Sequence, residues 1–435
     1  MAELAKRALR NKEARVVVAF SAANLLVGLG SNRLLTEAIA PARLGELYLF
    51  TNLAQWLGLP ATTSYLYVVR YWQVAREGGE VGAFWRALRG GIAFQFAFAL
   101  IGAVCFWLAG SVQLGAGGAI LLAISAGAAG TAQVLDPLPT GERRRTTVGL
   151  LGLAGSPARQ GVLALAGLLL GQVSLASLAV VHTAHAVLLA VVTFLVAAGI
   201  ANKASAGAKS STFQARKEIT PSGYMRYVWP FFFTAILTQV AASSERWGLA
   251  KLSSPSATAV FVQAVGLSMA GAGAATSFLN SYFIPIIAQA AGAKAAPVAS
   301  AGRHLRRYIL LTLGLLAVFA GCMSVLAGPL TSLLFGARYA AVARYLPLTA
   351  IGASLFAGGQ ALGMVAFTAK EAVTPNAARW VSLAVYSILL WVASGTSDPV
   401  FSFSWSYVAA NGLYAALMAA SAGWHLRGAL GAKDD

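Results

Sequence analysis

Long apolar stretches, about twelve of them, make up most of this chain of 435 residues and restrict its fold more than any other feature. Each stretch is long enough to cross a hydrocarbon core of about 30 Å as a helix. The alternation of apolar and polar residues that a membrane-spanning strand requires is absent. Charged residues make up only 11% of the chain, against roughly 25% in a soluble domain. The sequence therefore predicts an all-α polytopic membrane protein.

The predicted membrane helices follow one another with short gaps, apart from one longer polar stretch. Their ranges are Val16–Ile39, Leu47–Val69, Gly90–Ser111, Gly117–Leu135, Thr147–Leu170, Ser174–Ile200, Tyr224–Ala250, Ala257–Ile287, Tyr308–Ala327, Ala343–Ala369, Ala377–Ser394 and Val400–Trp424. Proline inside a helix removes a backbone hydrogen bond, so it bends the helix and frees a carbonyl group. We therefore expect bends at the prolines within these ranges, which are Pro60, Pro157, Pro230 and Pro285.

Lysine and arginine concentrate in every second gap between the apolar stretches. Cytoplasmic loops of membrane proteins retain these residues, which resist translocation. The intervening gaps contain few of them, namely Arg43, Lys251, Arg338 and Arg344. This asymmetry predicts that both termini are cytoplasmic and that the basic N-terminus leads into an uncleaved first helix. The net charge of +18 lies beside apolar segments, where it suits anionic lipid headgroups, so we expect no nucleic-acid partner.

The longest polar gap, Ala201–Ser222, divides the predicted helices into two sets of equal number. We therefore predict an N-terminal six-helix lobe (residues 1–200), a cytoplasmic linker (201–222) and a C-terminal six-helix lobe (223–435). An even number of helices in each half gives both halves the same orientation, so a duplication would be parallel. A weak internal similarity supports duplication, because Asn32–Tyr48 aligns with Glu245–Phe261. That alignment places Arg33 on Arg246.

Residues with catalytic or metal-binding chemistry are sparse. The sequence has no HExxH motif, no P-loop and no serine elbow, so we predict no enzyme activity, cofactor or metal. His182 and His185 are not four residues apart and have no carboxylate nearby in sequence. We interpret them as packing or polar lining residues rather than metal ligands. Cys105 and Cys322 lie inside apolar helices, which favours buried small hydrophobic residues over a disulfide.

Charged residues inside the apolar stretches are the main candidates for function. A charge in the membrane interior is costly, so such residues usually pair or face a water-filled cavity. Arg159 lies near the middle of the fifth predicted helix, which contains no acidic residue, and we expect it to line a cavity. Arg33 can pair with Glu37 one turn later.

Two more acidic positions extend this set. Glu245 adjoins Arg246 near the end of the seventh predicted helix, and Asp136 ends the fourth. We interpret Asp136 as a cap, or as a partner of the Arg143–Arg145 cluster. Glu37, Asp136 and Glu245 are also the candidate residues for coupling an ion to transport.

Neutral polar residues also fall within the predicted helices. They can hydrogen-bond a sugar in a cavity or bridge two helices, and bridging is the more common role for any one of them. These residues are Asn24, Asn52, Gln55, Gln133, Gln239, Gln263 and Asn280.

Three short motifs resemble a known family of exporters. Arg33 with Leu44-Gly45-Glu46-Leu47-Tyr48 is similar to the entry motif of the first helix in this family, although Leu44 replaces its usual aromatic residue. Glu245-Arg246 with Ala259-Val260-Phe261 is similar to the counterpart in the second half. Leu334–Tyr339 resembles a further motif between helices nine and ten. The chain thus resembles the polysaccharide-biosynthesis (O-antigen-type) flippases of the multidrug/oligosaccharidyl-lipid/polysaccharide exporter superfamily.

The resemblance implies two lobes around a central cavity that opens alternately to each side of the bacterial inner membrane. It implies a substrate of undecaprenyl pyrophosphate carrying an oligosaccharide, and partners among membrane lipids and a polysaccharide polymerase. Arginine matches phosphate oxygens well. The expected substrate-binding residues are Arg33, Arg159, Arg246, Asn24, Asn52, Gln55, Gln239 and Gln263.

Two other functions remain open. A cation-coupled multidrug exporter of the same fold would need acidic residues in its lumen, whereas the deep charges here include three arginines. A polytopic glycosyltransferase or polymerase would need catalytic acids on an outer loop. Glu46 and Asp398 are almost the only carboxylates on that side.

Overall fold

The computed structural model describes residues 12–111, 114–142, 144–171, 173–207, 219–292, 297–369, 373–393 and 395–431. Nearly all of these residues are helical, and no strand occurs among them. The prediction of an all-α polytopic fold is therefore confirmed. The chain forms two compact units, Met1–Gln239 and Val240–Asp435, and the division falls within one long helix, α11. The predicted boundaries at residues 200 and 223 stay predictions, and residues 208–218 of the predicted linker lie outside the described residues.

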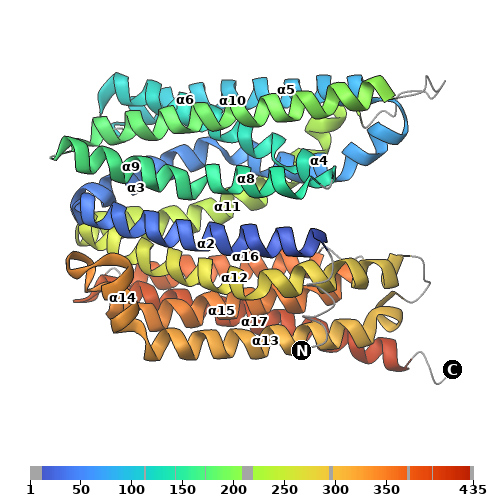
Figure 1. Cartoon of the computed structure of the whole chain (residues 1–435). Helices are drawn as coiled ribbons and strands as arrows, with labels where there is room; N and C mark the ends of the chain where they lie inside the picture. The colour runs from blue at the N-terminus through green and yellow to red at the C-terminus, as the bar shows by residue number, and fades with distance from the viewer. Residues whose placement is uncertain are drawn as a thin grey trace. The chain divides into compact units, whose positions relative to one another are not determined.

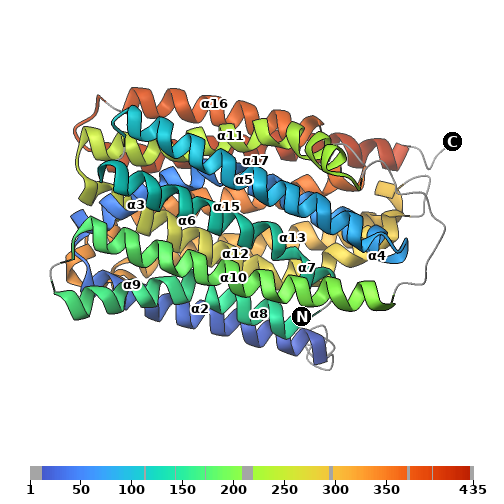
Figure 2. The same cartoon turned by 90° about the horizontal axis from the view of Figure 1, so that it is seen from above.

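The N-terminal unit contains ten labelled helices or parts of helices. They are α2 (Lys12–Ala38), α3 (Pro41–Leu57), α4 (Leu59–Glu77), α5 (Val81–Leu108), α6 (Gly115–Leu135), α7 (Pro137–Gly141), α8 (Arg145–Ala154), α9 (Ser156–Leu170), α10 (Leu175–Gly207) and the first part of α11 (Pro221–Leu252). Figures 1 and 2 show α2 running alongside α8 and α9. Helix α6 contacts both α5 and α10. This arrangement places α2, α8 and α9 together in one part of the unit.

Aromatic residues hold the start of α11 to the N-terminal unit. Tyr67 of α4 stacks on Phe84 of α5 and meets Tyr224 of α11 edge-on, with ring centroids 5.8 and 4.9 Å apart. All three side chains are buried. The Tyr224 ring lies so close to Gly91 that a Cβ at that position would approach it to 2.5 Å. Glycine is therefore needed there for α11 to pack on α5.

The C-terminal unit is built around helix α15. Its elements are the rest of α11, then α12 (Pro255–Gly292), α13 (Pro297–Val325), α14 (Ala327–Phe335), a 3₁₀ turn (Ala337–Tyr339), α15 (Val342–Thr368), α16 (Val373–Ala393) and α17 (Pro399–Gly431). Helix α15 contacts α12, α13 and α17 (Figure 1). A buried hydrogen bond of 2.8 Å between the hydroxyls of Ser268 and Thr349 joins α12 to α15. Tyr308 donates a bond of 2.8 Å to Asn280, so Asn280 bridges α12 and α13.

Eight helical stretches among the described residues are long and apolar enough to cross a membrane. Each of the predicted ranges overlaps a helix or a pair of consecutive helices. Large apolar side chains are exposed on both units, for example Leu108, Leu169, Val325 and Trp391. Such exposure is costly in water and favourable in lipid. The chain is a multi-pass membrane protein.

Two predicted membrane helices are broken where proline follows a glycine. The second is divided at Gly58, just before Pro60, and the fifth is divided at Gly155, just before Pro157. At the first break the N–H of Ala61 bonds to Gly58 instead of Leu57. The amide of Gln95 on α5 donates to the freed Leu57 carbonyl at 2.7 Å. The bends expected at these two prolines are confirmed, whereas helices α11 and α12 continue through positions 230 and 285.

The cysteines differ from the prediction in one respect. Both are free, as expected, but Cys105 on α5 and Cys322 on α13 are exposed and not buried. An apolar helix in a membrane can place a small apolar residue toward lipid at no cost, so apolar surroundings in the sequence do not imply burial.

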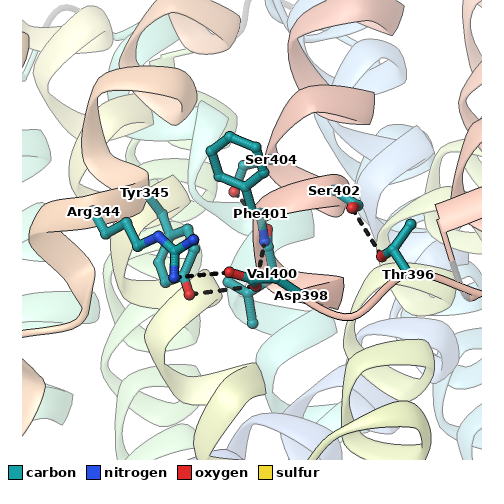
Figure 3. Close-up of polar contacts among 8 residues, drawn as sticks. All are labelled: Arg344, Tyr345, Thr396, Asp398, Val400, Phe401, Ser402 and Ser404. Atoms are coloured by element: carbon teal, nitrogen blue, oxygen red, sulfur yellow. Dashed lines mark hydrogen bonds and ion pairs between the residues drawn. The ribbon is translucent and has the colours of Figure 1, made fainter.

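A set of polar contacts fixes the start of α17 in the C-terminal unit (Figure 3). The Asp398 carboxylate accepts a hydrogen bond of 3.0 Å from the Phe401 N–H, which caps the helix, and pairs with Arg344 at 2.9 Å. The Arg344 guanidinium also lies over the rings of Tyr345 and Phe401. Because Arg344 lies in the first turn of α15, these contacts join the first turns of α15 and α17.

Candidate functional site

The N-terminal unit contains a cavity of about 580 Å³. Five helices contribute to its wall, which are α2, α6, α8, α9 and α10. Its polar lining residues are Ser21, Asn24, Gln133, Asp136, Arg145, Ser156, Arg159, His182, His185 and Thr193. A cavity of this size can hold a compact polar headgroup or a small ligand.

Small residues in the wall allow the helices around the cavity to pack closely. The cavity is lined by Gly149 and Gly152 of α8, by Gly155 at the end of that helix, and by alanines of α6. A Cβ at Gly149 would overlap the Phe20 ring of α2, and one at Gly152 would come within 2.9 Å of the Asn24 amide nitrogen. Helix α2 therefore packs closely on α8, and this packing brings Asn24 into the cavity wall.

The break between α8 and α9 positions the central residue of the cavity. With Gly155 and Pro157 interrupting the helix, the Ala154 carbonyl accepts from the ring nitrogen Nε2 of His185 on α10, at 2.9 Å. Ala154 ends α8, so its carbonyl has no partner within that helix, and a side chain of a neighbouring helix bonds it, as Gln95 bonds the carbonyl at the end of α3. Helix α9 then begins at Ser156, and its first turn carries Arg159 into the cavity.

Among the described residues, Arg159 finds little direct stabilisation. Its Nη2 lies 3.4 Å from the Ser156 hydroxyl. Arg159 takes part in none of the ion pairs found among the described residues. A guanidinium inside a membrane unit without a carboxylate partner must be stabilised by water or by an anion. The cavity therefore favours a negatively charged ligand beside Arg159.

The other polar groups of the cavity are unevenly satisfied. His182 is 5% exposed, and among the described residues no partner is found for its Nδ1. The same holds for the Oδ1 of Asn24. Asp136, after the last turn of α6, and Arg145, at the start of α8, line the cavity as well. A ligand that has both hydroxyl groups and negatively charged oxygens could satisfy these groups together.

The structure distributes the other predicted site residues of the N-terminal unit over separate places. Arg33 forms the expected ion pair with Glu37. Asn52 is fully buried, and its backbone carbonyl accepts a bond of 3.4 Å from Gln239. Gln55 is exposed. Of the predicted residues, Asn24, Asp136 and Arg159 meet in the cavity.

The C-terminal unit holds a second cluster of charged residues. Glu245 on α11 accepts a hydrogen bond from the Tyr386 hydroxyl on α16. Arg379, also on α16, lies with its guanidinium carbon 4.7 Å from the Phe356 ring centre and 5.7 Å from that of Tyr414. Arg379 is close enough to Glu245 for their opposite charges to interact. Cation–π contacts and a nearby carboxylate together stabilise this charge inside the unit.

The two remaining predicted residues also lie in the C-terminal unit. Gln263 is 5% exposed. Arg246 is half-buried, and its backbone carbonyl accepts a bond of 3.1 Å from Thr258.

Sequence reasoning finds part of these two sites. His182 and His185, interpreted as packing or lining residues, do line the cavity. The role of Arg379 is missed, because its position near the start of a helix makes it count as a residue of a basic cytoplasmic gap. Its aromatic neighbours come from α15 and α17, and no spacing in the sequence reveals such a contact. No group of three metal-binding side chains occurs among the described residues.

The sequence matches no protein-family model, and no curated protein is similar to it in sequence. Its fold, however, is similar to those of solved transporters. The lipid II flippase MurJ in an inward closed conformation matches with a TM-score of 0.70 and 12% identity, over 93% of this chain and 87% of MurJ. An inward-facing multidrug resistance MATE family transporter of the MOP superfamily matches with a TM-score of 0.62 and 14% identity, over 96% and 99% of the two chains. A mutant of the Vibrio cholerae MATE transporter VcmN matches with a TM-score of 0.61 and 16% identity, over 98% of each chain.

These similarities define the architecture of the chain. It has the polytopic helical fold that the lipid II flippase and the MATE transporters share.

Proposed function

We propose that this protein is a flippase of the exporter superfamily that includes MurJ and the MATE transporters. It moves undecaprenyl-pyrophosphate-linked oligosaccharide from the inner to the outer leaflet of the bacterial cytoplasmic membrane by alternating access. The observation that carries the proposal is the cavity around Arg159, whose guanidinium has no carboxylate partner among the described residues. The fold similarity to a lipid II flippase supports a lipid-linked substrate.

The residues of the cavity suit an anionic headgroup. A guanidinium donates two parallel hydrogen bonds to phosphate oxygens, and Arg159 has only a 3.4 Å contact with Ser156 to give up. Asn24 and Gln133 line the same cavity and can bond sugar hydroxyls. The prenyl chain would stay in the lipid. Arg33 and Arg246 remain proposed headgroup ligands, and Arg33 would have to exchange Glu37 for a phosphate.

A multidrug exporter is the second candidate. Asp136 in the cavity wall and the fold similarity to MATE transporters favour it, since an acidic residue can hold a cationic drug or a coupling ion. A polymerase is less well supported. The two carboxylates that could serve as its catalytic acids are held in ion pairs, Glu46 with Arg43 and Asp398 with Arg344.

The test compares Arg159→Gln with Arg159→Lys in a strain that lacks its polysaccharide flippase. Loss of charge-assisted hydrogen bonds worth about 1.5–3 kcal/mol each predicts that Arg159→Gln lowers surface polysaccharide roughly tenfold or more. Arg159→Lys keeps the charge and should restore part of the activity. Immunoblots of membrane fractions must show equal amounts of both variants.

Two results would contradict the flippase proposal. One is full polysaccharide export with Arg159→Gln. The other is failure of the wild-type chain to complement the strain while it raises resistance to cationic drugs, which would favour the multidrug exporter.

A further inference from the structure

Two histidines of α10 stand in the wall of the cavity that contains Arg159. His182 and His185 are one turn apart, so they lie on the same face of the helix. A carbonyl oxygen can only accept, so the 2.9 Å contact with Ala154 requires a proton on Nε2 of His185. Its Nδ1 is then the ring atom that can take up a second proton. His182 is buried against the edge of Phe50 and keeps an unpartnered Nδ1 among the described residues.

The charged groups around the histidines come from several helices. Arg159 of α9 is the charge that acts on both rings, and Tyr48 of α3 interacts with Arg159. Asp136 at the end of α6 and Arg145 at the start of α8 carry opposite charges and line the same cavity. Helix α2 contributes the uncharged Ser21 and Asn24. Because Asp136 and Arg145 offset each other, Arg159 supplies the net positive charge of the described cavity wall.

Charge balance decides what happens when an anion enters. A ligand end with two negative charges would leave one charge unmatched beside a single guanidinium, and an unmatched charge is costly in a low-dielectric cavity. An imidazolium beside Arg159 is disfavoured while the cavity is empty, because burial penalises the charged form and because like charges repel. A bound dianion replaces the repulsion with attraction, which favours protonation of a neighbouring imidazole.

We propose that the cavity binds its dianionic ligand together with a proton, which His182 or His185 takes up. The inference rests on the proposed function, because it assumes that the site around Arg159 binds an anion, and it adds the proton as the second ligand of that site. By linkage, binding that takes up a proton becomes tighter as the pH falls. The binding constant should change by up to about tenfold for each pH unit below the pKa that the histidine has in the complex.

Sulfate is a suitable probe, because its two charges do not change between about pH 5.5 and 8, where histidine titrates. Isothermal titration calorimetry on the full chain in lipid nanodiscs would give the affinity at each pH. Repeating the titration in two buffers with different ionisation enthalpies counts the protons taken up. The expected result for the wild-type protein is tighter binding at acidic pH with net proton uptake.

Four variants locate the effect. His185→Gln keeps an amide donor for the Ala154 carbonyl but cannot titrate. The double variant His182→Gln/His185→Gln should bind sulfate with an affinity that does not vary with pH, and without proton uptake. Arg159→Gln should lose sulfate binding at every pH. His304→Gln, on α13 of the C-terminal unit and outside the cavity, should behave as the wild type.

The inference is overturned if the wild-type protein binds sulfate equally well at both ends of the pH range without proton uptake, or binds none. It is also overturned if the double histidine variant keeps the pH dependence, since the proton would then bind elsewhere. None of these outcomes bears on polysaccharide export by the Arg159 variants, which tests the proposed function separately.

Discussion

Arg159 and Arg379 show two ways of keeping a guanidinium inside a membrane protein. Arg159 stands at the first turn of a helix after a break and faces a cavity, so its charge is available to a ligand. Arg379 is enclosed by Phe356 and Tyr414 and lies near Glu245, so the protein itself satisfies it. The difference in surroundings supports the proposed role of Arg159 in ligand binding and suggests that Arg379 stabilises the C-terminal unit.

The role of Arg379 leads to a prediction about stability. Arg379→Gln should lower the free energy of unfolding by about 2 kcal/mol, because it removes the cation–π contacts and leaves Glu245 without a neighbouring positive charge. The double variant Arg379→Gln/Glu245→Gln should be more stable than Arg379→Gln alone, since it removes the uncompensated carboxylate as well. Thermal unfolding in nanodiscs, followed by tryptophan fluorescence, measures both. A double variant that is no more stable than Arg379→Gln alone would contradict an interaction between the two charges.

Close packing of α2 on α8 determines the shape of the cavity at the level of the helices. Gly149 leaves no room for a Cβ beside Phe20, whereas a Cβ at Gly30 of α2 would meet no atom within 4 Å. Both glycines lie inside helices, where alanine has the higher helix propensity by up to about 1 kcal/mol.

These two glycines give a matched pair of substitutions with opposite signs. Gly149→Ala should destabilise the protein by about 1–3 kcal/mol, because the methyl group forces α2 and α8 apart. It should also weaken sulfate binding, since Asn24 moves with α2. Gly30→Ala should leave stability unchanged or slightly higher. Equal melting temperatures for the two variants would show that α2 does not pack on α8 as described.

The sequence predicts the helices well and the contacts between them poorly. Long apolar stretches identify the membrane helices, and Pro60 and Pro157 mark the two breaks, because both signals are local. The partners at the breaks could not be predicted. Gln95 and His185 reach the carbonyls at these helix ends from helices that are distant in the sequence, and only the packed structure brings them together. The prediction that the cysteines are buried is wrong for a related reason, since the lipid-facing side of an apolar helix has no distinct sequence pattern.

For the whole molecule, the proposed substrate makes transport sensitive to the membrane potential. A headgroup with about two negative charges gains roughly 2.3 kcal/mol per charge for each 100 mV when it moves toward the positive side. We therefore predict that flipping in proteoliposomes is faster when the receiving side is positive. The measurement follows a fluorescent lipid-linked oligosaccharide while a potassium gradient with valinomycin sets the potential in either direction. Equal rates in both directions would contradict this prediction.

The accessible thiols of the two units have a practical consequence for the study of movement. Cys105 belongs to the N-terminal unit and Cys322 to the C-terminal unit, and the chain has only these two cysteines. Nitroxide spin labels can therefore be attached to the native sequence, one to each unit, without engineered mutations. Pulsed electron paramagnetic resonance then follows the separation of the labels through the transport cycle in an unaltered protein.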